Sequence, residues 1–329
     1  MLTSLADAQD VRKDDRPAYR PYAVSVRALR RLTPHFVRVT FTGPQLQWFG
    51  TDGDDQRIKL LFPCADGTLD DIGADDEATC LSGSWYERWR GLPVESRGAI
   101  RTYTVRAVRP DQAEVDVDMV AHGETGPASR WVGQARVGDR LVISGPDVRS
   151  AGSAGGRDWA PGDAREVLLA GDETAAPAIC AILERLPPGR RATAFIEVPA
   201  AGDQLPLELP AGVSIRWLAR EGRPHGALLL PAVTSWARRH GDLIGPGNGG
   251  AELEEVDIDS TILWDTPVLR QAPDTCGRGE RCGGAFYAWF AGEAGVIRAL
   301  RRTMVSEIGL CRRRVAFMGY WRDGRAEGQ

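Results

Sequence analysis

Residues 165–198, REVLLAGDETAAPAICAILERLPPGRRATAFIEV, determine the fold class expected for the C-terminal half of the chain. A short apolar run ends at Gly171, a helical pattern follows from Thr174, and a second apolar run ends at Val198. Strand, helix and strand in succession are typical of a βαβ unit, in which the two strands lie parallel in one sheet. This stretch therefore predicts an α/β domain with a mostly parallel sheet.

The same rhythm continues towards the end of the chain. Strand patterns occupy residues 213–220, 285–292 and 313–321, and helical patterns occupy residues 226–240 and 293–309. We expect this α/β nucleotide-binding domain to comprise residues 165–329, with an irregular Gly-, Asp- and Glu-rich insertion at about 240–284. Cys276 and Cys282 lie in that insertion, and their spacing fits neither a redox motif nor a zinc knuckle.

Residues 19–150 show a different pattern, which predicts a β-barrel domain. Strand-like runs separated by Gly, Pro and Asp occupy residues 22–32, 36–43, 57–63, 99–109, 113–123 and 139–146. Short strands without a long helix predict an antiparallel barrel, for which we expect six strands and Greek-key connections. Residues 66–98 are expected to form a long acidic loop, and one short helix is expected at 126–135.

Composition indicates the nature of the two remaining segments and narrows the kinds of partner expected. Residues 1–18 are expected to be a disordered polar tail, and the Gly/Ala/Pro-rich residues 151–164 a linker. The 329 residues carry a formal charge of −4, which does not favour a nucleic-acid partner. Because we find neither a signal peptide nor an apolar run of membrane-spanning length, we expect no membrane insertion and a cytoplasmic location.

The strand IRTYTVR, residues 100–106, carries a cation on each face. Arg101 and Tyr103 share one face, whereas Arg106 lies on the other. We expect such a strand to bring one of its cations to an anion. The Gly-bearing turn of HGETGPASRW, residues 122–131, precedes a helical pattern, and such a turn at a helix N-terminus suits a diphosphate. The alternative is a capped glycine turn without a ligand.

A second candidate site follows the first strand of the α/β domain. Asp172 and Glu173 suit the positive end of the next helix but would repel a phosphate, so we expect this turn to contact an uncharged ring or amide. Phosphate binding would then fall to Arg220, Arg223 and Arg325, although loop arginines are commonly only solvated surface. No HExxH, GxSxG or Walker motif is present, and no metal site is expected. A site for an anionic organic cofactor remains.

Five motifs, in this order, carry a resemblance to a known family. RTYTVR, DVDMVAHGETGPASRW, AGDETAAPAI, WFAGE and FMGYWRDGR together closely resemble the siderophore-interacting protein family, the FAD-dependent ferric-siderophore reductases of the ferredoxin-NADP reductase superfamily. The likeness extends from about Tyr19 to Arg325. It implies an oxidoreductase of iron homeostasis that holds FAD and takes electrons from NADPH, or from NADH.

In the barrel domain the resemblance implies an FAD site around the Arg-x-Tyr-Thr strand. Arg101 would pair with the diphosphate and Tyr103 would pack against the isoalloxazine. Thr104 would hydrogen-bond near the reactive ring nitrogen, so that Tyr103 and Thr104 are catalytic candidates. The other cofactor-binding candidates of this domain are Val105, His122, Gly123, Gly126, Pro127, Ala128 and Ser129.

In the α/β domain the resemblance implies a site for the nicotinamide nucleotide. Arg220 is assigned to the 2′-phosphate, whose double charge suits a bidentate donor. The other candidates are Gly171, Asp172, Glu173 and Thr174 near the nicotinamide, Ala291, Gly292 and Glu293 in the next crevice, and Tyr320 and Trp321. The last two would lie over or beside the flavin, or would be core aromatics.

The resemblance also implies a mechanism and partners. Hydride would pass from NADPH to FAD, and single electrons would then pass to ferric iron held in a siderophore, which releases ferrous iron. Lys59 is assigned to docking of the anionic ferric siderophore, with an ordinary surface lysine as the alternative. Ferredoxin is an alternative electron donor.

Two features depart from the family pattern. Asp147 and Arg149 follow the ISGP segment where the family has small residues, and the insertion at 240–284 is long. These departures leave two other functions open. One is a flavin reductase or redox tailoring enzyme with a non-iron acceptor, and the other is a catalytically silent siderophore-binding protein.

Overall fold

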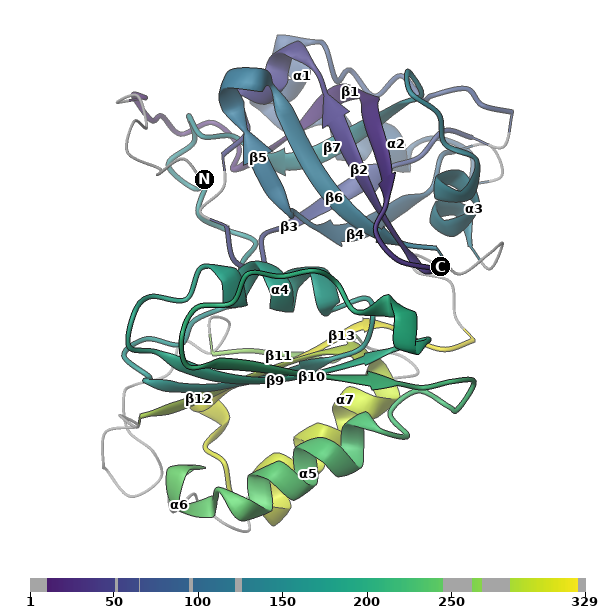
Figure 1. Ribbon diagram of the computed structural model, residues 1–329. Helices are drawn as coiled ribbons and strands as arrows, with labels where there is room; N and C mark the ends of the chain where they lie inside the picture. Colours follow the sequence, from purple (N-terminus) through teal and green to yellow (C-terminus); the bar gives the residue numbers. More distant parts are fainter. Residues whose placement is uncertain are drawn as a thin grey trace. The chain divides into compact units, whose positions relative to one another are not determined.

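The computed structural model describes residues 11–50, 53–64, 66–94, 97–121, 126–244, 262–267 and 285–324. The chain divides into two compact units (Figure 1). Unit 1 comprises Met1–Arg30 and Val37–Gly156, and unit 2 comprises Arg31–Phe36 and Arg157–Gln329. The boundary between the units therefore falls inside the Gly-rich segment 151–164.

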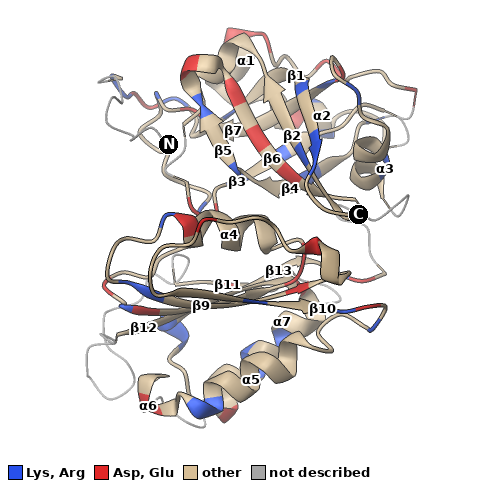
Figure 2. Ribbon diagram, viewed as in Figure 1, with Lys and Arg blue, Asp and Glu red and all other residues tan. Residues whose placement is uncertain are grey.

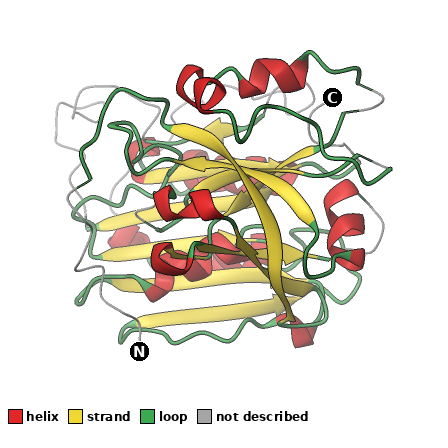
Figure 3. Ribbon diagram, turned by 90° about the horizontal axis from the view of Figure 1, so that it is seen from above, coloured by secondary structure: helices red, strands yellow, loops and turns green. Residues whose placement is uncertain are grey.

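Unit 1 is built on a curved, seven-stranded sheet (Figure 3). Its strands are β1 (Tyr19–Arg31), β2 (Phe36–Thr42), β3 (Arg57–Leu61), β4 (Ile100–Thr104), β5 (Ala107–Arg109), β6 (Glu114–Val120) and β7 (Arg140–Pro146). They follow the order β4-β3-β7-β1-β2-β6-β5, and β7 pairs antiparallel with both β1 and β3. One face buries an apolar core that includes Tyr22, Phe41, Leu60 and Met119, as expected for strands whose alternate side chains point inwards.

The strand count differs from the predicted six because the run at 99–109 forms two strands. β4 pairs with β3, whereas β5 pairs with β6. Between them the chain changes partners: the Val105 amide donates to the Gln56 carbonyl, and the Arg106 amide donates to the Asp116 carbonyl. A continuous sequence pattern does not reveal this corner, because both halves alternate alike. The Greek-key closure of the sheet stays a prediction.

The segment at 66–98, expected to be a loop, contains two short helices, α1 (Glu77–Ser82) and α2 (Trp85–Arg90). The Asp76 side chain caps α1 by accepting hydrogen bonds from the first-turn amides, which is a common way to begin a helix. Trp85 and Ile72 pack with Leu61 and Val142 on the second face of the sheet and form a small separate core. The prediction of a loop was wrong here because two short helices carry no sustained apolar period.

Shorter elements complete unit 1. They are α3 (Pro127–Gln134) and the 3-10 turns η1 (Pro44–Trp48) and η2 (Pro110–Gln112). The described part of the predicted tail, residues 11–18, is held to the unit: Asp14 forms a bridge with Ser150, and its amide donates to the Arg149 carbonyl. Asp147 and Arg149, which depart from the family pattern, form an ion pair with an N–O distance of 2.7 Å.

Unit 2 is a six-stranded α/β layer structure. Its strands are β8 (Glu166–Gly171), β9 (Arg191–Val198), β10 (Val213–Ala219), β11 (Trp264–Asp265), β12 (Phe286–Glu293) and β13 (Val315–Trp321), in the order β10-β9-β8-β12-β13-β11. The pairs from β10 to β13 are parallel, and only β11 is antiparallel among these described strands. The mostly parallel sheet predicted from the βαβ pattern is therefore confirmed.

Helices cover both faces of this sheet (Figure 1). The helical elements are α4 (Ala176–Glu184), α5 (Leu229–Arg239), α6 (Gly241–Ile244), α7 (Ala294–Arg301), the π-helical turn η4 (Arg302–Glu307) and the 3-10 turns η3 (Ala201–Asp203) and η5 (Arg312–Arg314). α4 lies on one face, and α5 and α7 lie on the other. Such strands, buried on both sides, have near-continuous apolar sequences, as β12 does.

The strand order of unit 2 reverses between β8 and β12. From β8 the chain proceeds through β9 to β10 on one side, and then returns to add β12 and β13 on the other side. In open α/β sheets, ligands bind outside the carboxyl ends of the strands at such a reversal. Gly171 ends β8 and Glu293 ends β12, so the ends of these two strands mark the candidate ligand site.

The predicted insertion at 240–284 is described only in part. Its described residues include α6 and the two-residue strand β11, which the sequence reading did not anticipate. Cys276 and Cys282 lie outside the described residues. No helix within the described ranges has both the length and the apolar character that a membrane span requires.

Candidate functional site

The predicted flavin strand is β4, the first strand of the sheet order in unit 1. Arg101 lies opposite Leu60 and Tyr103 lies opposite Ile58, so both share the face of two buried core residues. Tyr103 packs against the core at the edge of the Phe62 ring, with 6.4 Å between ring centroids. Thr104, which ends the strand, and Val105, which follows it, are buried.

Lys59 lies on the other face of the sheet. It is exposed and opposite Thr102, whose hydroxyl accepts a hydrogen bond from the lysine Nζ at 3.5 Å. Because alternate residues of a strand point to opposite faces, Lys59 shares its face with Thr104 and not with Arg101 or Tyr103. The predicted residues of the β3–β4 pair therefore lie on two faces of the sheet. Arg101 and Tyr103 lie on one face, and Lys59 and Thr104 lie on the other.

The predicted diphosphate turn precedes α3. His122 and Gly123 lie outside the described residues, whereas Gly126 is the N-cap and Pro127 begins the helix. The N-cap glycine has no side chain to cap this helix, and a Cβ on Gly126 would meet nothing within 4 Å. Among the described residues, no side-chain cap therefore competes for the first-turn amides of Ala128 and Ser129. A helix start of this kind suits an anion.

These residues fit a flavin dinucleotide in the chemistry of their donors. The uncapped helix start and the Arg101 guanidinium provide N–H donors for phosphate oxygens, and Thr104 provides a hydroxyl. The second cation of the strand has a different partner: Arg106 lies 3.5 Å from the buried carboxylate of Asp118. The expectation that one cation meets an anion is therefore confirmed for Arg106, with a protein carboxylate as the anion.

In unit 2, Asp172 joins the ends of three strands. Its Oδ1 accepts hydrogen bonds from the Thr174 amide and hydroxyl, at 2.9 and 2.6 Å. Its Oδ2 accepts from the Glu293 amide and from the Trp321 indole N–H, both at 2.8 Å. Because Asp172 follows β8, Glu293 ends β12 and Trp321 ends β13, the carboxylate stabilises the edge of the sheet at the candidate site.

The protonation equilibrium of Asp172 is unusual. Its side chain is only 3% exposed, and burial together with the neighbouring charge of Glu173 raises its pKa to about 6. The hydrogen bonds from Thr174 and Trp321 act in the opposite direction but are weaker than burial. Strongly shifted carboxyl groups are common at functional sites, and also in structural networks.

Glu173 and Arg220 form a buried ion pair. The guanidinium donates two hydrogen bonds to the Glu173 carboxylate, at 2.7 and 2.8 Å, and lies 3.9 Å from Glu197. Glu197 is fully buried and accepts hydrogen bonds from the amides of Gly226, Leu228 and Leu229 at the start of α5. A nucleotide 2′-phosphate would have to compete with two carboxylates for Arg220, so that its assignment to this phosphate stays a prediction.

Two glycines are required where the strands end. A Cβ on Gly171 would lie 2.4 Å from the Ala291 carbonyl oxygen, and one on Gly292 would lie 2.7 Å from the Asp172 carboxylate. Gly292 also has a φ of 148°, which side-chain-bearing residues rarely adopt. Glu293 caps α7 by accepting a hydrogen bond from the Val296 amide at 2.9 Å. The predicted residues of β8 and β12 are thus in direct contact.

The two aromatic residues at the end of β13 differ in their surroundings. Tyr320 stacks on Trp264, with 5.7 Å between centroids, and meets the Trp289 ring edge-on. Trp321 meets the His225 ring edge-on at 4.7 Å. Tyr320 thus packs among aromatic side chains of unit 2, whereas Trp321 belongs to the Asp172 cluster.

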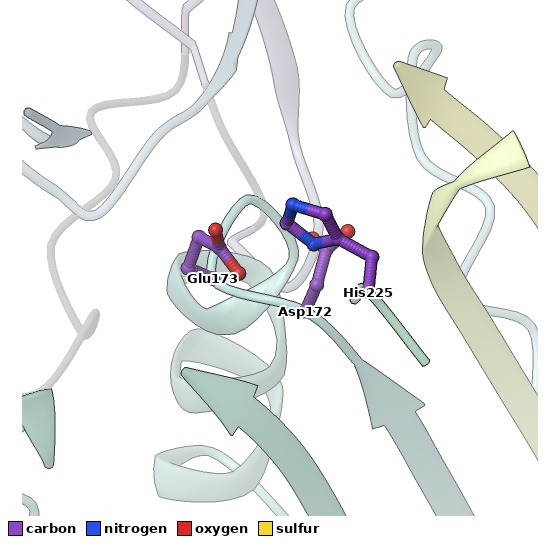
Figure 4. Close-up of side chains that lie close together, drawn as sticks. All are labelled: Asp172, Glu173 and His225. Carbon is purple, nitrogen blue, oxygen red and sulfur yellow. The ribbon is translucent and has the colours of Figure 1, made fainter. Parts of the chain in front are cut away.

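His225, which the motif search did not single out, lies in this cluster (Figure 4). Ligand atoms of Asp172, Glu173 and His225 lie within 4.8 Å of one another. This spacing would suit a metal ion, but both carboxylates already accept charged or neutral hydrogen bonds from protein groups. Sequence reasoning missed His225 and Glu197 because neither belongs to a motif. The only signals are the position of His225 in the loop after β10 and that of Glu197 near the carboxyl end of β9.

A shallow hollow, too small to hold a water molecule in this structure, lies beside the cluster at the reversal of strand order. Its lining includes Asp172 and Glu197, the loop residues His225 and Gly226, and the strand-end residues Gly292 and Glu293. Three of these residues carry carboxylates, which would repel a phosphate group. The arrangement suits an uncharged ring or amide, as the sequence analysis expected of the turn after β8.

Comparisons with known proteins connect both units to one family. A model described as the siderophore-interacting FAD-binding domain matches residues 25–150, and a model described as siderophore-interacting protein matches residues 164–324. The uncharacterized protein Rv2895c of Mycobacterium tuberculosis is 32% identical over 93% of this chain and 92% of its own length. The ferric vibriobactin reductase ViuB of Vibrio cholerae is 28% identical over 90% of this chain and 87% of its own length.

A solved structure agrees with these matches. The siderophore utilization protein from T. fusca has a TM-score of 0.65 to this chain at 27% sequence identity. The match covers 96% of this chain and 97% of the other. Both units are therefore shared with the solved protein.

Proposed function

Because the chain belongs to the siderophore-interacting protein family, we propose that it is an FAD-containing reductase that takes electrons from NADPH and reduces ferric iron held in a siderophore. The family combines an FAD-binding domain with relatives named as ferric-siderophore reductases, which supports an oxidoreductase. The observation that supports the proposal is that each unit has a feature typical of a nucleotide-binding site. One is the uncapped α3 start in unit 1, and the other is the strand-order reversal in unit 2.

In unit 1, the proposed site holds FAD through residues of β4 and α3. When bound, FAD supplies the chemistry that links a two-electron donor to a one-electron acceptor. Arg101 and the amides of Ala128 and Ser129 bind the diphosphate, while Tyr103 and Thr104 position the ring system. The lack of a side-chain cap on α3 supports this assignment.

In unit 2, the proposed donor site is the hollow beside Asp172. The carboxylate holds Thr174, Glu293 and Trp321 in place, so it orders the rim of the site without needing to touch the nucleotide. Gly171 and Gly292 let the strand ends approach closely. The acidic lining supports an uncharged ring beside the hollow and disfavours phosphate groups there.

The acceptor is the ferric siderophore, which is a substrate and not a resident cofactor. Ferrous iron binds hard oxygen ligands less tightly than ferric iron does, so reduction weakens the chelate. Lys59 is exposed on the face shared with Thr104, which supports a role in docking an anionic chelate. The side chain is therefore proposed to act on substrate affinity and not on flavin binding.

An anaerobic assay tests the function as a whole. Purified protein should show the absorption bands of oxidised flavin, and these should bleach on addition of NADPH. Ferric siderophores should then yield ferrous iron, trapped by a ferrous-specific chelator. A protein that oxidises NADPH but produces ferrous iron from no ferric chelate would instead have a non-iron acceptor, and a protein without flavin bands would contradict the proposal.

Arg101→Ala tests the flavin site. Loss of a charge-assisted contact of about 2 kcal/mol should weaken FAD binding about thirtyfold and leave the purified protein largely colourless. The matched control is Arg140→Ala, since Arg140 is an exposed arginine on β7 of the same unit. Equal flavin content in both variants would contradict the role of Arg101.

Lys59→Ala tests the acceptor site. The KM for anionic ferric chelates should rise several-fold, because a cation that attracts them is lost, whereas the KM for neutral chelates and the flavin content should stay unchanged. Steady-state kinetics with a charged and an uncharged chelate in both proteins measure this difference. An equal change in KM for the charged and the uncharged chelate would show that Lys59 does not dock the anionic chelate.

A further inference from the structure

The connection between β3 and β4 exposes a group of apolar side chains. Of the six large apolar side chains that are strongly exposed in the described part of the chain, three belong to this connection: Leu81, Tyr86 and Val94. Single exposed apolar residues are normal, whereas several in one place are typical of a binding surface. Tyr86 lies on α2, is 43% exposed and is the aromatic member of the group. Its ring is the part of this surface that a planar ligand can stack against.

Tyr86 belongs to a stack of planar groups. Its ring is stacked on that of Trp89, with 5.6 Å between centroids and 23° between the ring planes, and it meets Trp85 edge-on at 5.5 Å. The Arg97 guanidinium lies over the Trp89 ring, 4.2 Å from its centroid. The Trp89 indole N–H donates to the Gly98 carbonyl at 2.9 Å, which fixes the middle of the stack. The orientation of the exposed Tyr86 ring is thus set before any ligand binds, which lowers the entropic cost of stacking.

The stack is attached to the face of the sheet on which Lys59 lies. Both tryptophans pack in the small core that includes Leu61 and Ile100. The residue pairs that share this face of β3 and β4 are, in order along the strands, Arg57–Thr104, Lys59–Thr102 and Leu61–Ile100. Successive pairs on one face are about 7 Å apart. Lys59 therefore lies between Thr104, which is proposed to position the flavin ring, and the residues that carry the aromatic stack.

The charges around the stack favour an anionic ligand. α2 carries one carboxylate, Glu87, and ends with Arg88 and Arg90. Arg88 lies 3.7 Å from the N-cap carboxylate of α1, whereas Lys59, Arg90 and Arg97 form no ion pair with any residue that the structure describes. A ligand that combines negative charge with an aromatic ring would meet both the cations and the exposed ring. Among iron chelators, catecholates and phenolates have this combination, because their donor oxygens are attached to the ring.

We propose that the Tyr86 ring stacks on an aryl group of the ferric chelate, so that the acceptor site extends from Lys59 to α2 and favours chelates whose iron-binding groups are aromatic. The inference rests on the proposed function, because it adds one side chain to the proposed acceptor site. Tyr86 is a binding residue in this proposal, and Trp89 positions its ring. Lys59 attracts the negative charge of the chelate, whereas Tyr86 recognises its ring.

Two substitutions separate the ring of Tyr86 from its hydroxyl group. Tyr86→Ser removes the ring, and Tyr86→Phe keeps it. The KM is measured on the FAD-loaded protein for two anionic acceptors, ferric dihydroxybenzoate, which has aromatic donor groups, and ferric citrate, which has none. Tyr86→Ser should raise the KM for ferric dihydroxybenzoate about fivefold, as expected for one aromatic contact, and leave the KM for ferric citrate unchanged. Tyr86→Phe should behave as the unaltered protein.

Leu209→Ser is the matched control, because Leu209 is an apolar residue of unit 2 that is exposed to a similar degree, 39%. This variant should leave both KM values unchanged. Binding of the gallium(III) complexes of the same two ligands, which are not reduced, offers a readout that does not depend on turnover. By calorimetry, Tyr86→Ser should weaken binding of the dihydroxybenzoate complex alone, whereas Lys59→Ala should weaken binding of both complexes because it removes a charge.

Several results would overturn the assignment. An equal effect of Tyr86→Ser on the two ligands, or no effect on either, would show that the ring does not contact an aryl group. A loss in Tyr86→Phe equal to that in Tyr86→Ser would show that the hydroxyl group, and not stacking, is responsible. Dimerisation in sedimentation experiments that is abolished by Tyr86→Ser would assign the surface to contact with a second copy of the chain.

Failure of the proposed function gives a different result. If the gallium dihydroxybenzoate complex binds in the expected Tyr86-dependent way but no ferric chelate yields ferrous iron, the docking site is supported and the reductase activity is contradicted. If ferrous iron is produced from both acceptors with no dependence on Tyr86, the reductase activity is supported and the docking site is contradicted.

Discussion

Two acidic clusters in this chain are buried to a similar degree but are balanced differently. In unit 1, Glu114, Asp116 and Asp118 alternate along β6 and form the red stripe visible in Figure 2. In unit 2, Asp172 and Glu173 follow one another at the end of β8. Asp116 and Asp118 are 6% and 2% exposed, and Asp172 and Glu173 are 3% and 0% exposed.

The β6 carboxylates are matched by arginines. Arg109 donates hydrogen bonds to Asp116 at 2.7 and 2.9 Å, and Arg38 donates to Asp118 at 2.7 and 2.8 Å. Burial alone would raise the pKa of Asp116, but the hydrogen bonds from Arg109 and Thr40 outweigh it and lower this pKa. The buried carboxylates of Asp116 and Asp118 are therefore each stabilised by an arginine.

The β8 carboxylates share a single buried arginine. Arg220 binds Glu173, whereas the donors to Asp172 within the described residues are all neutral. Burial and the charge of Glu173 consequently raise the pKa of Asp172 to about 6. The comparison shows that burial alone does not decide whether the pKa of a carboxyl group is raised or lowered. Pairing with arginines decides it, and the carboxyl group with the raised pKa, Asp172, lies at the candidate ligand site.

Removing the shared cation should have the largest effect. Arg220→Met would remove the guanidinium that donates two hydrogen bonds to the buried Glu173 carboxylate, and breaking a buried pair in this way costs about 3–5 kcal/mol of unfolding free energy. The second substitution Glu173→Gln should recover a large part of that loss, because the uncompensated charge is then gone. Urea denaturation of the single and double variants measures both effects. A double variant no more stable than Arg220→Met would show that packing, and not charge, determines the loss.

Asp172→Asn should remove a pH dependence of stability. The folded-state pKa of about 6 lies above the ordinary value of 3.8, so the folded protein binds the proton more tightly. The resulting stabilisation is complete below pH 3.8 and is lost as the pH rises through about 6, a change of about 3 kcal/mol. The asparagine variant loses acceptors at every pH but has no such slope. The two proteins are compared by urea denaturation between pH 4 and 7, and parallel curves would contradict the raised pKa.

Arg109→Met should have a smaller effect with the opposite pH dependence. The Arg109 side chain is 33% exposed, so solvent screens its contacts and the expected loss is about 1 kcal/mol at neutral pH. Because the pKa of Asp116 is lowered in the folded state, the stabilisation exists above the ordinary pKa and is lost on acidification. The difference between the unaltered protein and this variant should therefore shrink towards pH 3. A difference that stays constant with pH would mean that packing of the arginine stem accounts for it.

Part of the site was accessible from the sequence, because local patterns carry it. Gly126 and Pro127 indicated a helix start, and α3 begins there. The acidic turn after β8 indicated an uncharged ligand group, which agrees with the lining of the hollow. Arg220 and Glu173 were both recognised as candidates, but their ion pair was not, because the two residues are 47 positions apart.

Other features could not be read from local patterns. The corner that separates β4 from β5 depends on which strands offer partners to Val105 and Arg106. The role of Asp172 depends on Trp321, which is 149 positions away in the chain. His225 belongs to no motif, and within the described part of the chain it differs from His35 and His240 in having a buried Nδ1 atom without a hydrogen-bond partner.

The sequence by itself determined the two kinds of sheet and the family, because side-chain periodicity and short motifs are properties of neighbouring residues. The tertiary structure alone decided which charges are balanced. The pKa of a carboxyl group depends on the groups that surround it in three dimensions, and burial strengthens each of those interactions. The pairing of β6 with its arginines and the unbalanced Asp172 are therefore consequences of folding that no local pattern contains.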